Sequence, residues 1–376
     1  MKTLAVTLGV VAVLGASGGA ACAGDTLVPP LRVGDEEAYL QLYGQFSPSL
    51  LVVDDGRSTL GYGPIDNSNA SSRLGLRLYV GINSATYLGA DLEGEYDGYA
   101  TNYVDQLNRG GWDGHGALLR HAEGYLSSKP LGTLWLGQGD MASNNTAEVD
   151  LSGTDVVGYS SVSDLAGGQF FAYAGDAGLS AITVADAFSN LDGLDRKLRV
   201  RYDTPSLAGL TASASYGREV VPEVTGGDVW DVAVRYAHDS GPFKVAAAAA
   251  YSDTGSSNRV DGSASILHMA SGISLTGAAG YNAGDDGIDG RYLYGKLGYR
   301  HAFFDVGATA FAVDTYVGDS IDTPGAESLS FGAFVVQDFD DYQTQLYLGV
   351  RSYAYDDDAA DYRRLVAAMT GVRVKF

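Results

Sequence analysis

The sequence predicts an all-β fold, a transmembrane antiparallel β-barrel, and three observations predict it. Segments of about ten residues alternate between apolar and polar side chains, as strands with one apolar face do. The connections between these segments are alternately short and long. The chain has 51 Gly, 25 Tyr and a mean hydropathy of −0.03. Beyond its first residues it has no run of roughly 20 apolar residues that would form a membrane helix.

The N-terminus predicts export. Residues 1–23 have the organisation of a secretory signal peptide: Lys2 precedes the apolar run from Leu4 to Leu14, and small residues lead to Ala21-Cys22-Ala23. The apolar run is too short for an uncleaved anchor that spans a bilayer. Residues 24–376 would then form the barrel.

Cys22 is the only cysteine in the chain. A lipoprotein would carry lipid on this residue, but the position three residues earlier is Gly19, where such sites usually have Leu. Cleavage after the signal peptide removes the thiol, which excludes disulfides, thiolate metal sites and a cysteine nucleophile from the mature chain.

Sixteen segments follow the alternation, and the second shows it well. Leu74, Leu76 and Leu78 alternate there with Arg73 and Arg77. The fourth segment, around residue 120, is a candidate for a bulge. The segments begin near residues 38, 71, 86, 117, 132, 197, 209, 229, 243, 263, 273, 291, 304, 328, 342 and 364. An even number of strands lets an antiparallel barrel close with both termini at one rim and no exposed edge.

The connections separate a barrel from other all-β folds. Even-numbered connections such as 82–85 and 205–207 are short, whereas odd-numbered ones such as 54–69 and 98–116 are mostly long and polar. Short turns at one rim and long loops at the other are typical of an outer-membrane barrel. A secreted sandwich, solenoid or adhesin also has alternating strands, but no fixed short repeat of a solenoid is present.

The longest gap, residues 138–196, lies between the fifth and sixth segments. From Gln138 to Asp195 it has nine carboxylates and no Lys, Arg or His. Segments 170–173 and 179–184 are candidates for an extra hairpin within it. Five acidic residues are the candidates for a pore constriction: Asp140, Glu148, Asp150, Asp155 and Asp164.

Basic residues gather on the polar faces of the predicted wall strands. If they face the acidic segment, the opposite charges produce a transverse field that orients dipolar solutes and resists apolar ones. The alternative is that each cation is a solvated lumen residue paired with a nearby carboxylate. The candidates are Arg73, Arg77, Arg120, Lys197, Arg199 and Arg201.

The chain ends in an alternating strand with a terminal aromatic, Phe376, which shares its face with Val372 and Val374, while Arg373 and Lys375 lie on the other. Three further patterns occur: RHAEGY at 120–125 with GTLWLG at 132–137, DLSGT at 150–154, and RVRYDTP at 199–205. In these features the whole mature chain resembles the general porins of Gram-negative outer membranes, in particular the sixteen-stranded, trimeric alphaproteobacterial type.

The resemblance implies a location, partners and an activity. The protein would pass through the periplasm to the bacterial outer membrane, contact lipid and lipopolysaccharide, and form a homotrimer. Its third external loop, 138–196, would fold into the lumen and narrow the pore. We expect a water-filled channel for passive diffusion of small hydrophilic solutes and ions, with modest cation preference because of the acidic segment.

Two other functions remain open. A channel specific for a sugar or another nutrient is favoured if aromatic residues such as Trp135 or Tyr159 line the constriction. An outer-membrane adhesin or receptor would use a closed barrel to present its external loops. Stable conductance steps in a bilayer would separate a channel from an adhesin.

Enzymes and nucleic-acid-binding proteins are disfavoured. The five His residues occur singly, without His-Glu-x-x-His spacing, and no G-x-S-x-G motif is present. A net charge of −22 argues against nucleic acid. No cofactor is expected. Acidic clusters at 356–358 with Asp361, and at Asp285-Asp286, have oxygen ligands suited to Ca²⁺, but without EF-hand spacing we interpret them as solvated loop charge.

Overall fold

The computed structural model describes residues 31–96, 98–109, 117–175, 178–220, 227–284 and 289–376. The predicted signal peptide and the Asp285-Asp286 pair lie outside these ranges. No helix among the described residues has the length and apolarity to cross a membrane.

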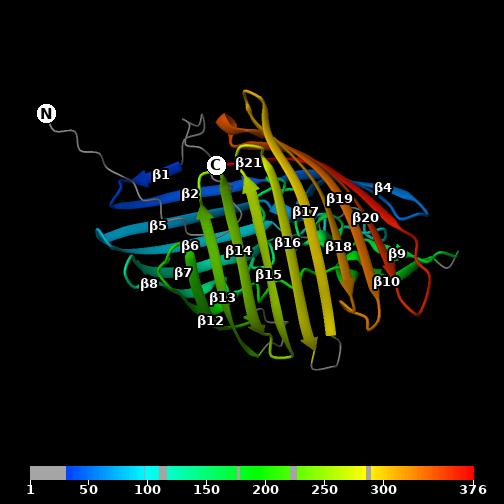
Figure 1. Cartoon of the computed structure of the whole chain (residues 1–376), viewed down its shortest axis with the longest axis horizontal. Coiled ribbons are helices and arrows are strands. Elements are labelled where there is room, and N and C mark those ends of the chain that lie inside the picture. The colour runs from blue at the N-terminus through cyan, green and yellow to red at the C-terminus, as the bar shows by residue number, and fades with distance from the viewer. Residues whose placement is uncertain (1–30, 97, 110–116, 176–177, 221–226, 285–288) are drawn as a thin grey trace.

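Sixteen antiparallel strands close into one barrel, as predicted. Figure 1 shows them around the wall in chain order, from blue β2 through green β14 to red β21. The strands are β2 (Ala38–Phe46) continued by β3 (Pro48–Asp54), β5 (Arg73–Asn83), β6 (Thr86–Tyr96), β7 (Ala117–Ser128), β8 (Gly132–Asp140), β11 (Arg196–Asp203), β12 (Leu210–Arg218), β13 (Asp228–Asp239), β14 (Phe243–Asp253), β15 (Ser257–His268), β16 (Ile273–Gly284), β17 (Asp289–Phe304), β18 (Gly307–Asp319), β19 (Glu327–Phe339), β20 (Thr344–Asp356) and β21 (Leu365–Lys375).

The first and last strands form the closing seam of the barrel. Strand β21 pairs with both halves of the first strand, from Val366 opposite Asp54 to Lys375 opposite Gln45. Beyond the last ladder pair, the backbone of Phe376 exchanges two hydrogen bonds with Gly44, at 3.0 and 3.1 Å. The seam leaves neither end strand as an open edge, which is what lets an antiparallel sheet stand in a membrane.

The wall has one apolar and one polar face, in the alternation that the sequence shows. On β5, the side chains of Leu74, Leu76 and Leu78 are 54%, 39% and 39% exposed, whereas Gly75 between them is buried. Exposed apolar side chains recur at alternate positions of other strands, for example Leu198, Val200 and Tyr202 on β11. We call the polar face, opposite these side chains, the inner face of the wall.

Two predicted irregularities are confirmed. The register between β6 and β7 shifts at Glu93 and Gly94, so that Arg120 has no partner across the ladder and forms the expected bulge. Strands β9 (Phe170–Ala172) and β10 (Leu179–Thr183) form the extra hairpin.

Other elements were not expected. Strand β4 (Thr59–Asp66) forms a hairpin with β3 inside the predicted loop 54–69. Tyr62 of this hairpin is buried and its hydroxyl bonds Gln169 at 3.3 Å, so the hairpin gains its stability from distant residues. The short β1 (Leu31–Gly34) pairs with β2. Two 3₁₀ turns, η1 (Ser68–Ala70) and η3 (Asp340–Tyr342), occur in connections.

Candidate functional site

Residues 141–195, which we call the internal segment, connect β8 and β11 and contact the inner face of the wall. The segment contains η2 (Val162–Leu165), the β9–β10 hairpin and α1 (Val184–Ala187). Its early backbone N–H groups donate to hydroxyls of wall strands: Ala142 to Ser215 at 2.8 Å, Val149 to Ser263 at 2.9 Å and Leu151 to Ser265 at 3.0 Å. Short polar side chains at these wall positions let the segment approach closely.

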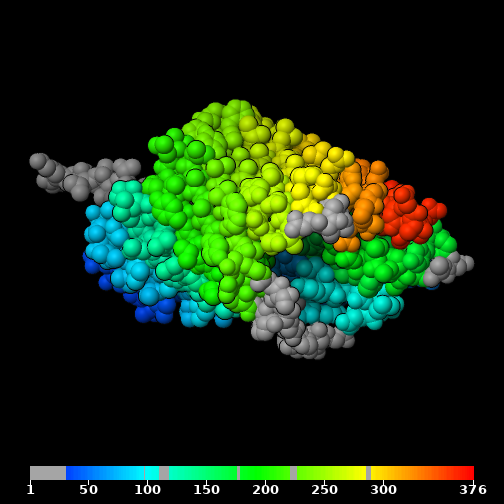
Figure 2. Space-filling model, turned by 90° about the horizontal axis from the view of Figure 1, so that it is seen from below, coloured from blue at the N-terminus to red at the C-terminus, as the bar shows by residue number. Residues whose placement is uncertain are grey.

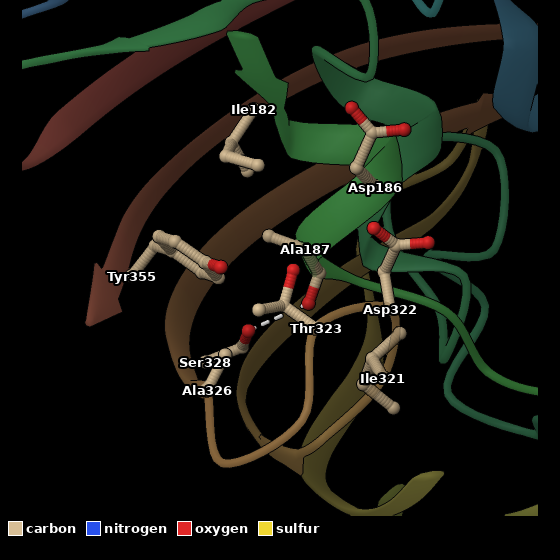
Figure 3. Close-up of a pocket in the computed structure, with 9 residues that line it drawn as sticks. All are labelled: Ile182, Asp186, Ala187, Ile321, Asp322, Thr323, Ala326, Ser328 and Tyr355. Carbon is tan, nitrogen blue, oxygen red and sulfur yellow. Dashed lines mark hydrogen bonds between the residues drawn. The ribbon is translucent and has the colours of Figure 1, made fainter. Parts of the chain in front are cut away.

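The later part of the internal segment is held by strands farther around the wall. The hydroxyls of Tyr316, Ser328 and Tyr353 donate to the carbonyls of residues 189, 187 and 162 at 2.7, 2.6 and 2.7 Å. Figure 3 shows the middle contact, where Ala187 of α1 meets Ser328 beside Tyr355. The segment is therefore fixed along β12 to β20, which leaves β2 and β5 to β8 without such cover. Figure 2 shows the molecule hollowed between yellow wall strands and blue-to-cyan early segments.

A buried ion pair joins the internal segment to the wall. The Lys296 ammonium lies 2.6 Å from the Asp150 carboxylate and 2.6 Å from the Gly158 carbonyl oxygen. Burial alone would raise the pKa of the Asp150 carboxyl, but the Lys296 charge reverses the effect and the pKa lies below its usual value. Asp150 is thus a structural anchor.

Besides the exposed Asp186, three carboxyls of the internal segment have no cationic partner among the described residues. Glu148 accepts from the Asn190 amide at 2.8 Å, Asp192 from the backbone N–H of residue 147 at 2.8 Å, and Asp164 from the Tyr159 hydroxyl. Burial, with Asp192 nearby, raises the pKa of Glu148 well above its usual value. Burial also raises the pKa of Asp164 and of Asp192 to about 6. These acids therefore carry less negative charge than their number suggests.

The remaining two acidic candidates lie apart from each other. Asp140 is at the end of β8, where its carboxylate is 3.1 Å from Arg196. The Asp155 side chain is 30% exposed, and its carboxylate is 3.9 Å from Arg373. The five predicted acids therefore do not form one cluster, and the Asp155 side chain is more exposed than those of Asp140 and Asp150.

Five of the six predicted wall cations have carboxylate partners on neighbouring wall positions. Arg77 pairs with Asp91 at 2.9 Å, and Arg120 with Glu93 at 2.6 Å. The remaining pairs are Lys197 with Glu219 at 2.8 Å, Arg201 with Asp203 at 2.8 Å, and Arg199 with Glu123. The alternative interpretation, a lumen cation paired with a nearby acid, fits these five.

Some of the inner-face cations also hold the start of the internal segment. Arg199 donates to the Asp140 carbonyl at 2.9 Å and Arg201 to the Met141 carbonyl at 3.1 Å. Arg235 donates to the carbonyls of residues 142 and 144 at 2.8 and 2.7 Å. Sequence reasoning missed Arg235, Lys296 and Arg373, although each lies on the polar face of an alternating strand, which was the available signal.

Arg73, the sixth candidate, belongs to a different group. It lies opposite Gln45 on β2, and Lys375 of β21 lies opposite the other side of Gln45. Within the described part of the chain, neither Arg73 nor Lys375 makes an ion pair within 4.0 Å of a carboxylate. Both side chains are partly exposed. They form an inner-face cation pair close to the seam.

No group of three or more His, Cys, Asp or Glu in the described ranges is arranged to hold a metal ion. In the acidic stretch 356–358, the Asp357 carboxylate accepts backbone N–H groups of residues 359 and 360 at 2.8 and 3.1 Å. Hydroxyls of Tyr355 and Tyr362 bond the same carboxylate at 3.1 and 3.0 Å. Asp357 therefore organises its own loop.

Comparisons with known proteins show to which family the chain belongs. The Gram-negative porin family matches residues 9–358. Among solved structures, an anion-selective porin from Comamonas acidovorans is 18% identical with a TM-score of 0.61, covering 90% of this chain and 100% of that one. The trimer form of OmpT from Vibrio cholerae is 14% identical, with a TM-score of 0.55 and coverage of 91% and 100%. OmpF of Salmonella typhi in complex with daunomycin is 13% identical, with a TM-score of 0.57 and coverage of 92% and 100%.

No curated protein sequence matches the chain. The structural likenesses establish the barrel fold, and the family match extends over nearly the whole sequence. The protein is thus a channel protein rather than an enzyme, and it belongs to the Gram-negative porin family of the bacterial outer membrane.

Proposed function

We propose that the protein is a water-filled pore for passive diffusion of small hydrophilic solutes and ions, narrowed by the internal segment inside the lumen. The observation that carries this proposal is the row of hydrogen bonds from the segment's backbone to inner-face hydroxyls, at 2.8 to 3.0 Å for Ser215, Ser263 and Ser265. A segment held against one side of the wall leaves the opposite, charged side for solutes. Charged and polar linings favour hydrated solutes over apolar ones.

Recording from the purified protein in a planar lipid bilayer tests the proposal. A porin gives stable open steps in potassium chloride, and neutral solutes above the pore size no longer reduce the conductance. A correctly folded barrel that stays electrically silent would contradict the proposal and favour the adhesin or receptor.

The cation preference expected from the acidic segment is not supported. Asp150 and Asp140 are ion-paired, and burial raises the pKa of Glu148 and Asp164. We propose instead a weak anion preference, set by the inner-face cation pair, Arg73 and Lys375. The Comamonas acidovorans neighbour is described as an anion-selective porin, in keeping with this proposal. A reversal potential in a salt gradient measures the preference, and cation selectivity would overturn it.

We further propose a homotrimer whose exposed apolar face contacts outer-membrane lipid and lipopolysaccharide. The support is the band of exposed Leu, Val and aromatic side chains around the wall, together with the trimer form described for OmpT of Vibrio cholerae. Gel electrophoresis before and after boiling tests the trimer. An unheated species that runs as a single chain, with light scattering of the same mass, would contradict it.

A further inference from the structure

Five aromatic rings form a continuous band on the inner face, across β2, β5, β6, β7 and β8. Their centroids lie 4.3 to 6.0 Å apart in sequence around the wall. The aromatic band consists of Tyr39, Tyr79, Tyr87, Tyr125 and Trp135. It lies near the short connections 84–85 and 129–131, and on wall strands that the internal segment leaves uncovered.

The direction of these rings follows from their neighbours. Tyr79 and Arg77 both lie on the inner face of β5. Leu78, between them, lies on the lipid side and is 39% exposed. A Cβ at Gly89 would meet the ring of Tyr125, so this ring lies over the glycine backbone with one face against the wall. All five rings are partly exposed, which leaves surface for a solute to contact.

Polar groups lie along the band. Arg77 holds Asp91 through two hydrogen bonds, at 2.9 and 3.2 Å, and Trp135 donates its ring N–H to Asp203 at 2.9 Å. The hydroxyls of Tyr39, Tyr79, Tyr87 and Tyr125 make no hydrogen bond with any residue in the described ranges. Because the four rings are partly exposed, these hydroxyls are left to water or to a ligand.

This arrangement combines flat apolar surfaces with a row of donors and acceptors. An ion passing through water gains little from adjacent aromatic rings, and rings that anchor a barrel in lipid lie on its outer face. A ligand that matches these surfaces has one flat apolar face and hydroxyl groups around its edge. We propose that the aromatic band binds pyranose sugars as they pass through the pore.

The inference rests on the proposed channel function, because the sugar reaches the band through the lumen. The transient site would lie beyond the charged part of the lumen, towards the short connections. Neighbouring rings at 4.3 to 6.0 Å would let a sugar move from one ring to the next without leaving the wall. A series of weak contacts allows both entry and exit, as permeation requires.

Current recordings with maltotriose test the proposal, with a polyethylene glycol of equal hydrodynamic radius as the probe that cannot stack. Maltotriose is expected to interrupt the potassium chloride current in a saturable way, whereas the polymer lowers conductance only in proportion to its volume. Replacing Tyr125 and Trp135 by Leu is expected to raise the half-saturating concentration of maltotriose by about tenfold. Tyr216→Leu, on the lipid face, is the matched control and is expected to leave it unchanged.

The outcomes separate the two proposals. No conductance in potassium chloride contradicts the channel itself. A conducting pore in which maltotriose acts like the polymer, or in which the Leu variants behave like the wild type, overturns only the sugar site. Saturable interruption by benzyltrimethylammonium but not by maltotriose would also overturn it, because the rings would then recognise aromatic cations.

Discussion

Arg73 and Lys375 differ from the five other cations predicted for the pore wall, because each of those five has a carboxylate within 4.0 Å. An ion pair that is neutral overall exerts a weak field beyond a few ångströms, and salt screens it further. Two unpaired cations on either side of Gln45 therefore dominate the local potential. Removing them should reveal the contribution of Asp155 on the internal segment.

We expect the double variant Arg73→Gln/Lys375→Gln to shift the reversal potential towards cations. The anion-to-cation permeability ratio should fall about two- to fivefold, as expected for the loss of ~0.4–1 kcal/mol of attraction across water. Measurement in a tenfold potassium chloride gradient decides the outcome.

The matched control is Arg218→Gln/Arg291→Gln, which removes the same charge from exposed pairs with Asp228 and Asp319. The control should keep the wild-type reversal potential. Equal shifts in both double variants would mean that net charge, rather than the inner-face cation pair, sets the selectivity.

Lys296 offers a second test, because breaking a buried ion pair leaves a charge without compensation. Lys296→Met should destabilise the packing of the internal segment by about 3–5 kcal/mol. We expect noisier open-channel currents and faster protease cleavage within residues 141–195. Adding Asp150→Asn removes the stranded carboxylate and should restore much of the wild-type behaviour. If Lys296→Met gives currents no noisier than the wild type and is cleaved no faster by protease, the Lys296–Asp150 pair does not anchor the internal segment.

The sequence showed which residue types lie on the inner face, but it could not show which of them pair. Arg77 and Asp91 are close because β5 and β6 form a hairpin, so their pairing follows from predictable register. Lys296 and Asp150 are separated by 146 positions, and their contact depends on the path of the internal segment. Their separation explains why a one-sided run of acids predicted more negative charge than the folded segment exposes.

At the scale of elements, the internal segment carries titratable groups that connect its packing to pH. Burial raises the pKa of Asp164 and Asp192 to about 6, above the value of 3.8 for an unperturbed Asp. Both groups therefore bind protons more tightly in the folded state. Their contribution to stability is fully present below about pH 4 and is lost as the pH rises through 6. The pKa of Asp150 is lowered, so its pair with Lys296 persists across this range.

We expect the open-channel noise to be low at pH 4.5 and to increase towards pH 7, as the packing of the internal segment loosens. The variant Asp164→Asn/Asp192→Asn should keep the low noise at both values, because an amide does not ionise. Current-noise spectra at the two pH values provide the measurement. A pH dependence that is unchanged in the variant would assign it to other groups.

Most elements could be predicted because a membrane strand must keep one apolar face over about ten residues, and that constraint appears directly in the sequence. Strand β15 begins at Ser257 rather than near residue 263 because its alternation continues beyond the bilayer width, with Val260 exposed and Asp261 inside. The β3–β4 hairpin was not predicted, because Gly61, Gly63 and Pro64 are residue types typical of turns and loops. Its buried residues pack against the internal segment, which no local pattern reveals.

At the scale of the whole molecule, the barrel depends on the seam between β21 and the first strand. A Cβ at Gly44 would lie 2.8 Å from the Phe376 ring and would also clash with the carbonyl of Arg73. Gly44→Val should therefore weaken closure and reduce the fraction of heat-modifiable folded barrel on an unheated gel. Gly295→Val, on β17, is the matched control, since nothing lies within 4 Å of its added Cβ. Equal yields of folded barrel from both variants would show that this seam tolerates a side chain.

The same seam also determines the order in which the barrel can assemble. Gly44 and Phe376 meet across almost the full length of the chain, and contacts between such distant residues form slowly because a very large loop must close first. Until β21 is present, the growing sheet has two free edges whose backbone groups would pair with any other strand. Barrel closure therefore requires the C-terminal strand. Until that strand is in place, the free edges of the incomplete sheet have to be kept from pairing with other chains.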